Sequence, residues 1–129
     1  MVFNREGNWE MSESLYERLG RSEGITRIAN DVVDNHSRNE RISRRFADSD
    51  MDKLKKMAAE FFIKGSGGPN VYKGKDMIAA HRGLNIDSDE FLTVLDDTMD
   101  ALDKNGVGQR EKEEVLSVLF SLKDQVMRQ

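Results

Sequence analysis

Only two side chains of this sequence could bind a transition metal through an imidazole nitrogen, because it has two histidines, and none could bind one through a thiolate, because it has no cysteine. His81 falls on the inner face of a short predicted helix that follows a glycine-rich run. A lone imidazole with no carboxylate or thiolate beside it cannot hold a bare ion. It could be the axial ligand of a haem iron, because the porphyrin supplies four of the ligands. The alternative, which the spacing alone favours, is a core histidine satisfied by a backbone carbonyl.

The second histidine, His36, ends an apolar stripe at helical spacing that runs from Ile25 to Val33. We interpret it as a partly exposed histidine near a helix C-terminus, where the helix dipole favours its positive charge. The alternatives are a second iron ligand and a distal hydrogen-bond donor.

Large apolar side chains that could line a flat cofactor would equally serve a helical core. They are Phe46, Phe61, Phe62, Phe91, Met51, Met57, Met77 and Met99. Methionines fill gaps in cores by default. Met57 differs because its thioether could ligate iron if haem were present.

Several functional classes are disfavoured by what the sequence lacks. It has no GxSxG or HExxH motif, and its GSGGP run at 65–69 is not followed by the Lys-Ser/Thr of a nucleotide loop. The acidic pairs Asp48/Asp50 and Asp96/Asp97 are predicted to be solvated surface. A net charge of −4 argues against nucleic-acid binding. No run approaches the roughly 20 apolar residues of a membrane span, and no signal peptide is evident, so we expect a cytoplasmic protein.

The elements that must position these residues are helices, since one proline and ten glycines leave few breakers. The patterns predict an all-α fold of about six helices. Their expected positions are a short helix at 12–19 capped by Ser12 or Ser14, a helix from 24 to 36, a brief turn at 39–46, a helix capped by Asp48 or Ser49, a loop at 65–74, a short helix around 77–81, a helix from an Asp87/Glu90 capping box to Asn105-Gly106, and a last helix through Val115 and Val126. Residues 1–12 are expected to be a tail, with Phe3 and Trp9 as docking points, and residues 13–129 one domain.

Four segments in a fixed order carry a family resemblance. They are LYERLG at 15–20, FADSDM at 46–51, GGP at 67–69 with Tyr72 and Gly74, and MIAAHRGL at 77–84. In this order and spacing the chain resembles the truncated, two-over-two haemoglobins, most closely their first group, over about residues 13–127. The resemblance implies four helices stacked two over two around haem b (iron protoporphyrin IX), with the proximal helix reduced to a loop and a short turn.

The resemblance also implies roles for individual residues. His81 matches the proximal iron ligand, Phe46 the phenylalanine packed on the porphyrin, and Gly67-Gly68 the glycine pair before the proximal helix. Lys53 and Tyr72 fall where family members contact haem propionates. The remaining expected haem contacts are Val33, Leu54, Met57, Ala58, Phe61, Met77, Ile86 and Phe91.

The distal side departs from the family pattern. Val32-Val33 stand where a Phe-Tyr pair is usual, Leu54 and Ala58 where polar residues often assist, and Met57 where some members have an internal iron ligand. The family also has an earlier glycine pair, and the matching residues here are Gly20-Arg21, so one of the two glycines is missing. A donor to bound dioxygen is worth about 1.5–3 kcal/mol, so its loss weakens affinity about 10- to 150-fold. We therefore expect an apolar distal pocket that binds dioxygen weakly. The affinity for carbon monoxide should be reduced less, because bound carbon monoxide is less polar. Met57 as a sixth ligand is a second hypothesis.

The function implied by the resemblance is binding of diatomic gases (O2, NO, CO), as in oxygen transport or nitric oxide binding. Nitric oxide dioxygenase activity requires stable ferrous dioxygen, which the missing donors disfavour. The alternatives are a redox or electron-transfer haem protein and a haem-free interaction or signalling module. The expected partners are small gases, with a reductase as a further candidate and neither nucleic acid nor membrane, and the expected state is a monomer or weak dimer.

Overall fold

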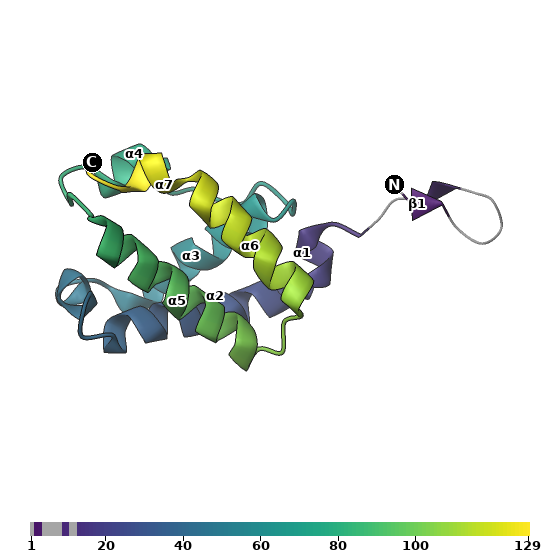
Figure 1. Ribbon diagram of the computed structural model, residues 1–129, viewed down its shortest axis with the longest axis horizontal. Coiled ribbons are helices and arrows are strands. Elements are labelled where there is room, and N and C mark those ends of the chain that lie inside the picture. The colour runs from purple at the N-terminus through teal and green to yellow at the C-terminus, as the bar shows by residue number, and fades with distance from the viewer. Residues whose placement is uncertain (1, 4–8, 11–12) are drawn as a thin grey trace.

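The computed structural model describes residues 2–3, 9–10 and 13–129, and from residue 13 onward its regular elements are helices (Figure 1). They are α1 (Leu15–Arg18), α2 (Arg21–Arg38), the 3-10 turn η1 (Ser43–Phe46), α3 (Met51–Gly65), α4 (Met77–His81), α5 (Ser88–Lys104), α6 (Gln109–Ser121) and α7 (Lys123–Val126). The expected all-α class is confirmed for this part of the chain. Before it, β1 (Val2–Phe3) and β2 (Trp9–Glu10) pair antiparallel, which the sequence patterns did not predict. The rest of the expected tail and the docking side chains of Phe3 and Trp9 lie outside the described residues.

Two helix pairs form the body of the domain. Helix α3 packs along α2, α6 packs beside α5, and α2 also packs against α5, which joins the pairs. Figure 1 shows α5 and α6 in front of α2 and α3. The short helix α4 lies against α7 at one end. Two layers of two helices are thus the frame on which the remaining segments are placed.

The core follows the apolar stripe of α2, as its spacing predicted. Ile25, Ile28 and Val32 of this stripe are buried with Leu102 of α5 and Val115 of α6. A second buried cluster joins Ile86, Phe91 and Leu95. Burying each such side chain fully contributes roughly 1.5–3 kcal/mol, so the two clusters are the main stabilisation of the helix pairs.

Helix ends follow local sequence signals with three exceptions. The first is α2, which was expected at 24–36 but spans Arg21–Arg38. Asp87 and Glu90 form the predicted capping box, and Ser14 caps α1. The expected cap of α3 at Asp48 or Ser49 is wrong: Asp50 caps it, because the amide of Ser49 still bonds to Phe46 in the preceding turn. The predicted last helix is divided into α6 and α7 at Leu122.

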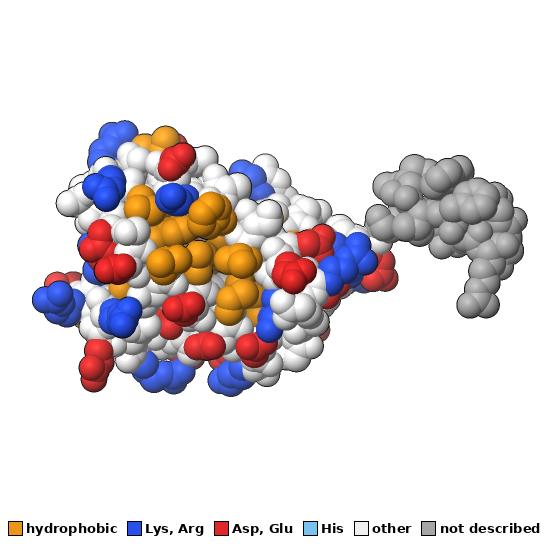
Figure 2. All heavy atoms as spheres, in the orientation of Figure 1, with side chains coloured by type: hydrophobic (Ala, Val, Ile, Leu, Met, Phe, Trp, Pro, Cys, Tyr) orange, Lys and Arg blue, Asp and Glu red, His pale blue; other side chains and the backbone are white. Residues whose placement is uncertain are grey.

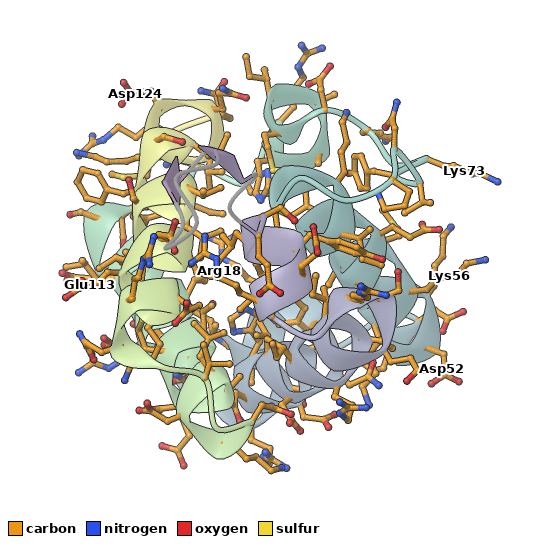
Figure 3. All side chains as sticks on the ribbon, turned by 90° about the vertical axis from the view of Figure 1, so that its right-hand side faces the viewer. Arg18, Asp52, Lys56, Lys73, Glu113 and Asp124 are labelled. Carbon is orange, nitrogen blue, oxygen red and sulfur yellow. The ribbon has the colours of Figure 1, made fainter. Side chains whose placement is uncertain are left out.

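Polar contacts tie the layers together at their edges. Arg18 of α1 donates to Glu111 at 3.0 Å and to Glu114 at 2.9 Å, both on α6. Figure 3 shows Arg18 between α1 and α6, whereas Lys56, Lys73 and Glu113 point outward. These hydrogen bonds lower the pKa of both glutamates.

The outer face of α5 and α6 carries exposed apolar side chains. Leu92 on α5 and Leu116 and Phe120 on α6 are the exposed large ones, and Figure 2 shows apolar side chains gathered over these two helices. Among the described residues, no helix is both long and apolar enough to cross a membrane.

Candidate functional site

The imidazole of His81 is oriented by its own short helix. Asp76 caps α4 by accepting from the amide of Ala79 at 2.8 Å. One turn later, Nδ1 of His81 lies 2.7 Å from the carbonyl oxygen of Met77. A carbonyl can only accept, so Nδ1 carries the proton and Nε2 keeps its lone pair. This is how histidine ligands of metals are usually oriented, by a hydrogen bond from the other ring nitrogen.

The loop before α4 is built around the glycine pair. Gly67 has a φ of +97°, which favours glycine. At Gly68 a Cβ would lie 2.7 Å from the Tyr16 ring and 2.8 Å from the carbonyl oxygen of Ile63, which leaves no room for a side chain. The amide of Tyr16 also bonds to the Ser66 carbonyl at 2.9 Å. The pair therefore lets the chain pass closely over α1 on its way to α4.

Tyr72 closes the same loop. Its hydroxyl donates to the carbonyl of Lys75 at 2.5 Å, and its ring meets Phe61 edge-on with centroids 5.7 Å apart. Burial, with Asp76 and Glu60 nearby, raises the pKa of this hydroxyl. The expected propionate contact would compete with this bond to Lys75.

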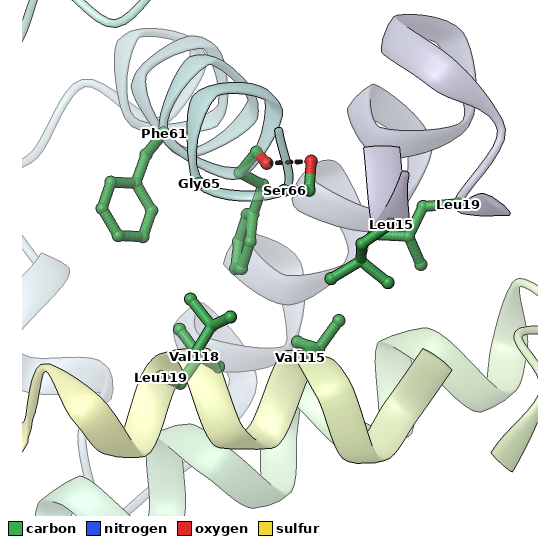
Figure 4. A pocket seen from close by; sticks show the side chains of 9 residues that line it. Leu15, Leu19, Phe61, Gly65, Ser66, Val115, Val118 and Leu119 are labelled. Carbon is green, nitrogen blue, oxygen red and sulfur yellow. Dashed lines mark hydrogen bonds between the residues drawn. The ribbon is translucent and has the colours of Figure 1, made fainter. Parts of the chain in front are cut away.

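An apolar hollow, open to solvent on one side, lies between α1, α3 and α6 (Figure 4). Its lining residues are Leu15, Leu19, Phe61, Phe62, Gly65, Ser66, Val115, Val118 and Leu119. The only hydroxyl among them, that of Ser66, donates to the Phe62 carbonyl at 2.6 Å. Of the expected haem contacts only Phe61 lines this hollow, and His81 does not. It is thus an apolar space beside the candidate site, and sequence reasoning missed its α1 residues because they come from a distant helix.

The expected distal residues lie on two helices packed together. Val33 of α2 is 5% exposed, and Leu54, Met57 and Ala58 of α3 are half-buried. None of these four side chains carries an N–H or O–H group. Whatever binds beside them meets hydrocarbon and one thioether.

The other expected contacts are distributed around α4 and α5. Met77 is half-buried at the start of α4, and Lys53 is exposed on α3. Ile86 and Phe91 are buried together with Leu95, α6 and the C-terminal segment. These two are core residues in the structure, and a cofactor contact would be a second role for them.

His36 and Asp97 differ from their sequence interpretation. His36 is buried, not partly exposed, and its Nδ1 lies 2.8 Å from the carboxylate of Asp97. Asp97 is buried as well, although it was predicted to be solvated surface. Helix α5 packs against both α2 and α6, so its buried face is wider than one stripe. Asp97 lies four residues from both Thr93 and Ala101, which are also buried, so it shares their inward face of α5.

The residues together fit a single-imidazole haem site. The hydrogen bond of His81 Nδ1 to a carbonyl leaves its Nε2 available as a ligand. In the part of the chain described, no cluster of three or more acidic, histidine or cysteine side chains is suited to a metal ion. A donor set of one imidazole suits an iron that a porphyrin already holds.

Comparison with known proteins places this arrangement in a family. Residues 14–128 match the family described as bacterial-like globin. A group 1 truncated hemoglobin of Tetrahymena pyriformis is 30% identical over 95 residues, covering 74% of this chain and 78% of that protein. One from Mycolicibacterium paratuberculosis is 29% identical over 113 residues, covering 88% and 83%.

Solved structures agree in fold. The Fe(III) form of the Tetrahymena pyriformis truncated hemoglobin superposes with a TM-score of 0.87 at 26% identity, covering 91% of this chain and all of that one. The 2/2 hemoglobin of a Synechococcus species, in the cyanomet state with covalently attached heme, gives 0.80 at 25% identity, covering 88% and 95%. The expected two-over-two sandwich is confirmed, and the chain belongs to the bacterial-like globins and, within them, to the group 1 truncated haemoglobins.

Proposed function

We propose that this protein would hold haem b through Nε2 of His81 and bind a diatomic gas at its iron. The single observation that carries the proposal is the hydrogen bond from Nδ1 of His81 to the Met77 carbonyl, which leaves Nε2 as a ligand. When bound, haem supplies an iron centre that can take O2, NO or CO. The protein supplies the axial imidazole, an apolar surround and, at Lys53 and Tyr72, groups for the propionates.

The chain's own distal residues set the selectivity of the proposed site. Dioxygen gains from an N–H or O–H donor because it draws electron density when bound, and such a bond contributes about 1.5–3 kcal/mol. Val33, Leu54, Met57 and Ala58 offer no donor. We therefore propose weak dioxygen binding, with nitric oxide and carbon monoxide less affected. Ligand binding is favoured over nitric oxide dioxygenation, which needs a long-lived dioxygen complex.

The test is the visible spectrum of the purified protein. We expect a Soret band in wild type that is lost in His81→Ala, because the only other imidazole of the sequence, that of His36, is held by Asp97. Arg82→Ala is the matched control, because Arg82 is the exposed neighbour of His81 at the end of α4, and it should keep the band. A colourless wild type after growth with ample haem, or a band unchanged in His81→Ala, would contradict the proposal and favour a haem-free interaction module.

A further inference from the structure

Three polar side chains at the C-terminal end of α2, two from the helix and one from its cap Asn39, converge on one residue of α5. Nδ1 of His36 lies 2.8 Å from one carboxylate oxygen of Asp97, and Nδ2 of Asn39 donates to the other at 3.0 Å. Nδ2 of Asn35 donates to the backbone carbonyl of Asp97 at 3.0 Å. The side chains of His36 and Asp97 are only 11% and 9% exposed. Because a buried carboxylate is costly unless it is fully paired, this group fixes the C-terminal turns of α2 on α5.

The same imidazole lies against Phe46. The two ring centroids are 5.8 Å apart with 15° between the planes, an offset stack. Phe46 ends η1, and its neighbour Arg45 donates to Glu90 at the start of α5 at 3.0 Å. Two acids of α5 thus restrain the turn that carries Phe46: Glu90 directly and Asp97 through His36.

We propose that His36 and Asp97 are positioning residues that hold Phe46 in place for haem. This inference rests on the proposed function, in which Phe46 packs on the porphyrin. Asp97 fixes the tilt of the imidazole, the imidazole sets the plane of Phe46, and Phe46 limits how far the cofactor can shift. The competing explanation is that the pair only ties α2 to α5.

Substitution of Asp97 by asparagine separates the two explanations. Asparagine keeps the shape but places an amide nitrogen at one of the two contacts. Either Asn39 loses its acceptor, or His36 must carry its proton on Nε2 and accept through Nδ1 instead of donating. In both cases a neutral amide replaces the carboxylate that holds the imidazole. The matched control is Asp31→Asn. Asp31 lies earlier on α2 and is 19% exposed, and it accepts from Asn105 at 2.8 Å and Lys104 at 3.1 Å at the end of α5. It is the same kind of α2–α5 tie, without a stacked phenylalanine.

The measurement is the rate of haem transfer to excess haem-free acceptor globin, followed at the Soret band, with urea unfolding of the haem-free variants beside it. Both substitutions should lower the free energy of unfolding. Asp97→Asn should speed haem loss about 5- to 30-fold, and Asp31→Asn less than about 2-fold. In a Phe46→Leu background the effect of Asp97→Asn should fall below about 2-fold, because the ring it positions is gone.

The outcomes separate this inference from the proposed function. Equal haem loss in Asp97→Asn and Asp31→Asn, or an undiminished effect of Asp97→Asn beside Phe46→Leu, would overturn the positioning role while the wild-type spectrum stands. A wild type with no His81-dependent Soret band would overturn both. The haem-free protein gives a further readout: the ring-proton NMR shifts of Phe46, which depend on how the His36 ring lies against it, should move in Asp97→Asn and stay in Asp31→Asn.

Discussion

Adding one donor to the distal wall tests the physical basis of weak dioxygen binding. Leu54 is the best position, because it is half-buried on α3 and a glutamine there has nearly the same volume. Val33 is less suitable, since it is 5% exposed and a tyrosine there would overfill the α2–α3 contact. Leu54→Gln therefore introduces an N–H group at small packing cost.

The expected change in dioxygen release follows from the distal side chains of the wild type. With no donor on Val33, Leu54, Met57 or Ala58, the wild type gains nothing from this interaction, so one new hydrogen bond contributes its full value of about 1.5–3 kcal/mol. Dioxygen release from the ferrous protein should slow about 10- to 150-fold. Carbon monoxide release should change much less, because bound carbon monoxide is less polar.

The assay is stopped-flow dioxygen release, with Leu54→Met as the control of similar volume without an N–H group. Slow release and tight affinity in the wild type would refute the apolar pocket itself. Equal release rates in Leu54→Gln and Leu54→Met would refute the view that position 54 reaches the bound gas.

Three further predictions concern stability and coordination. Arg18 holds the pKa of Glu114 below its ordinary value of 4.5, so this contribution to stability is complete above that value and is lost as the pH falls through the lowered pKa. The urea midpoint of unfolding should therefore fall on acidification from about pH 6 to pH 3, and it should fall less steeply in Arg18→Gln. An equal slope in both proteins would contradict this prediction. Gly68→Ala should lower the free energy of unfolding by about 1–3 kcal/mol, because its Cβ would clash with Tyr16 and Ile63. Gly65→Ala, whose Cβ meets nothing within 4 Å, should leave the free energy of unfolding unchanged. Urea unfolding compares the two variants, and equal losses would contradict the close approach at Gly68. If Met57 ligates iron when no gas is bound, Met57→Ala should change the ferrous visible spectrum, and identical spectra exclude the ligation.

Local signals in the sequence predicted most of the helices, including the short one that carries His81. The Asp87/Glu90 capping box and the α2 stripe depend on residues within one or two turns of each other, so their outcome is decided by helix geometry alone. The order of the segments around Gly67-Gly68 and His81 indicated the family, which the comparisons confirm. The hydrogen bond of His81 to Met77 is equally local, since it spans one turn of α4.

Only the tertiary structure decided how distant segments meet. His36 and Asp97 are 61 residues apart, and neither residue's own helix indicates that both are buried as a pair. The apolar hollow likewise joins Leu15 of α1 to Val118 of α6. Such contacts depend on which faces of α2, α5 and α6 pack together, and that choice minimises exposed apolar surface over the whole chain rather than within any one helix.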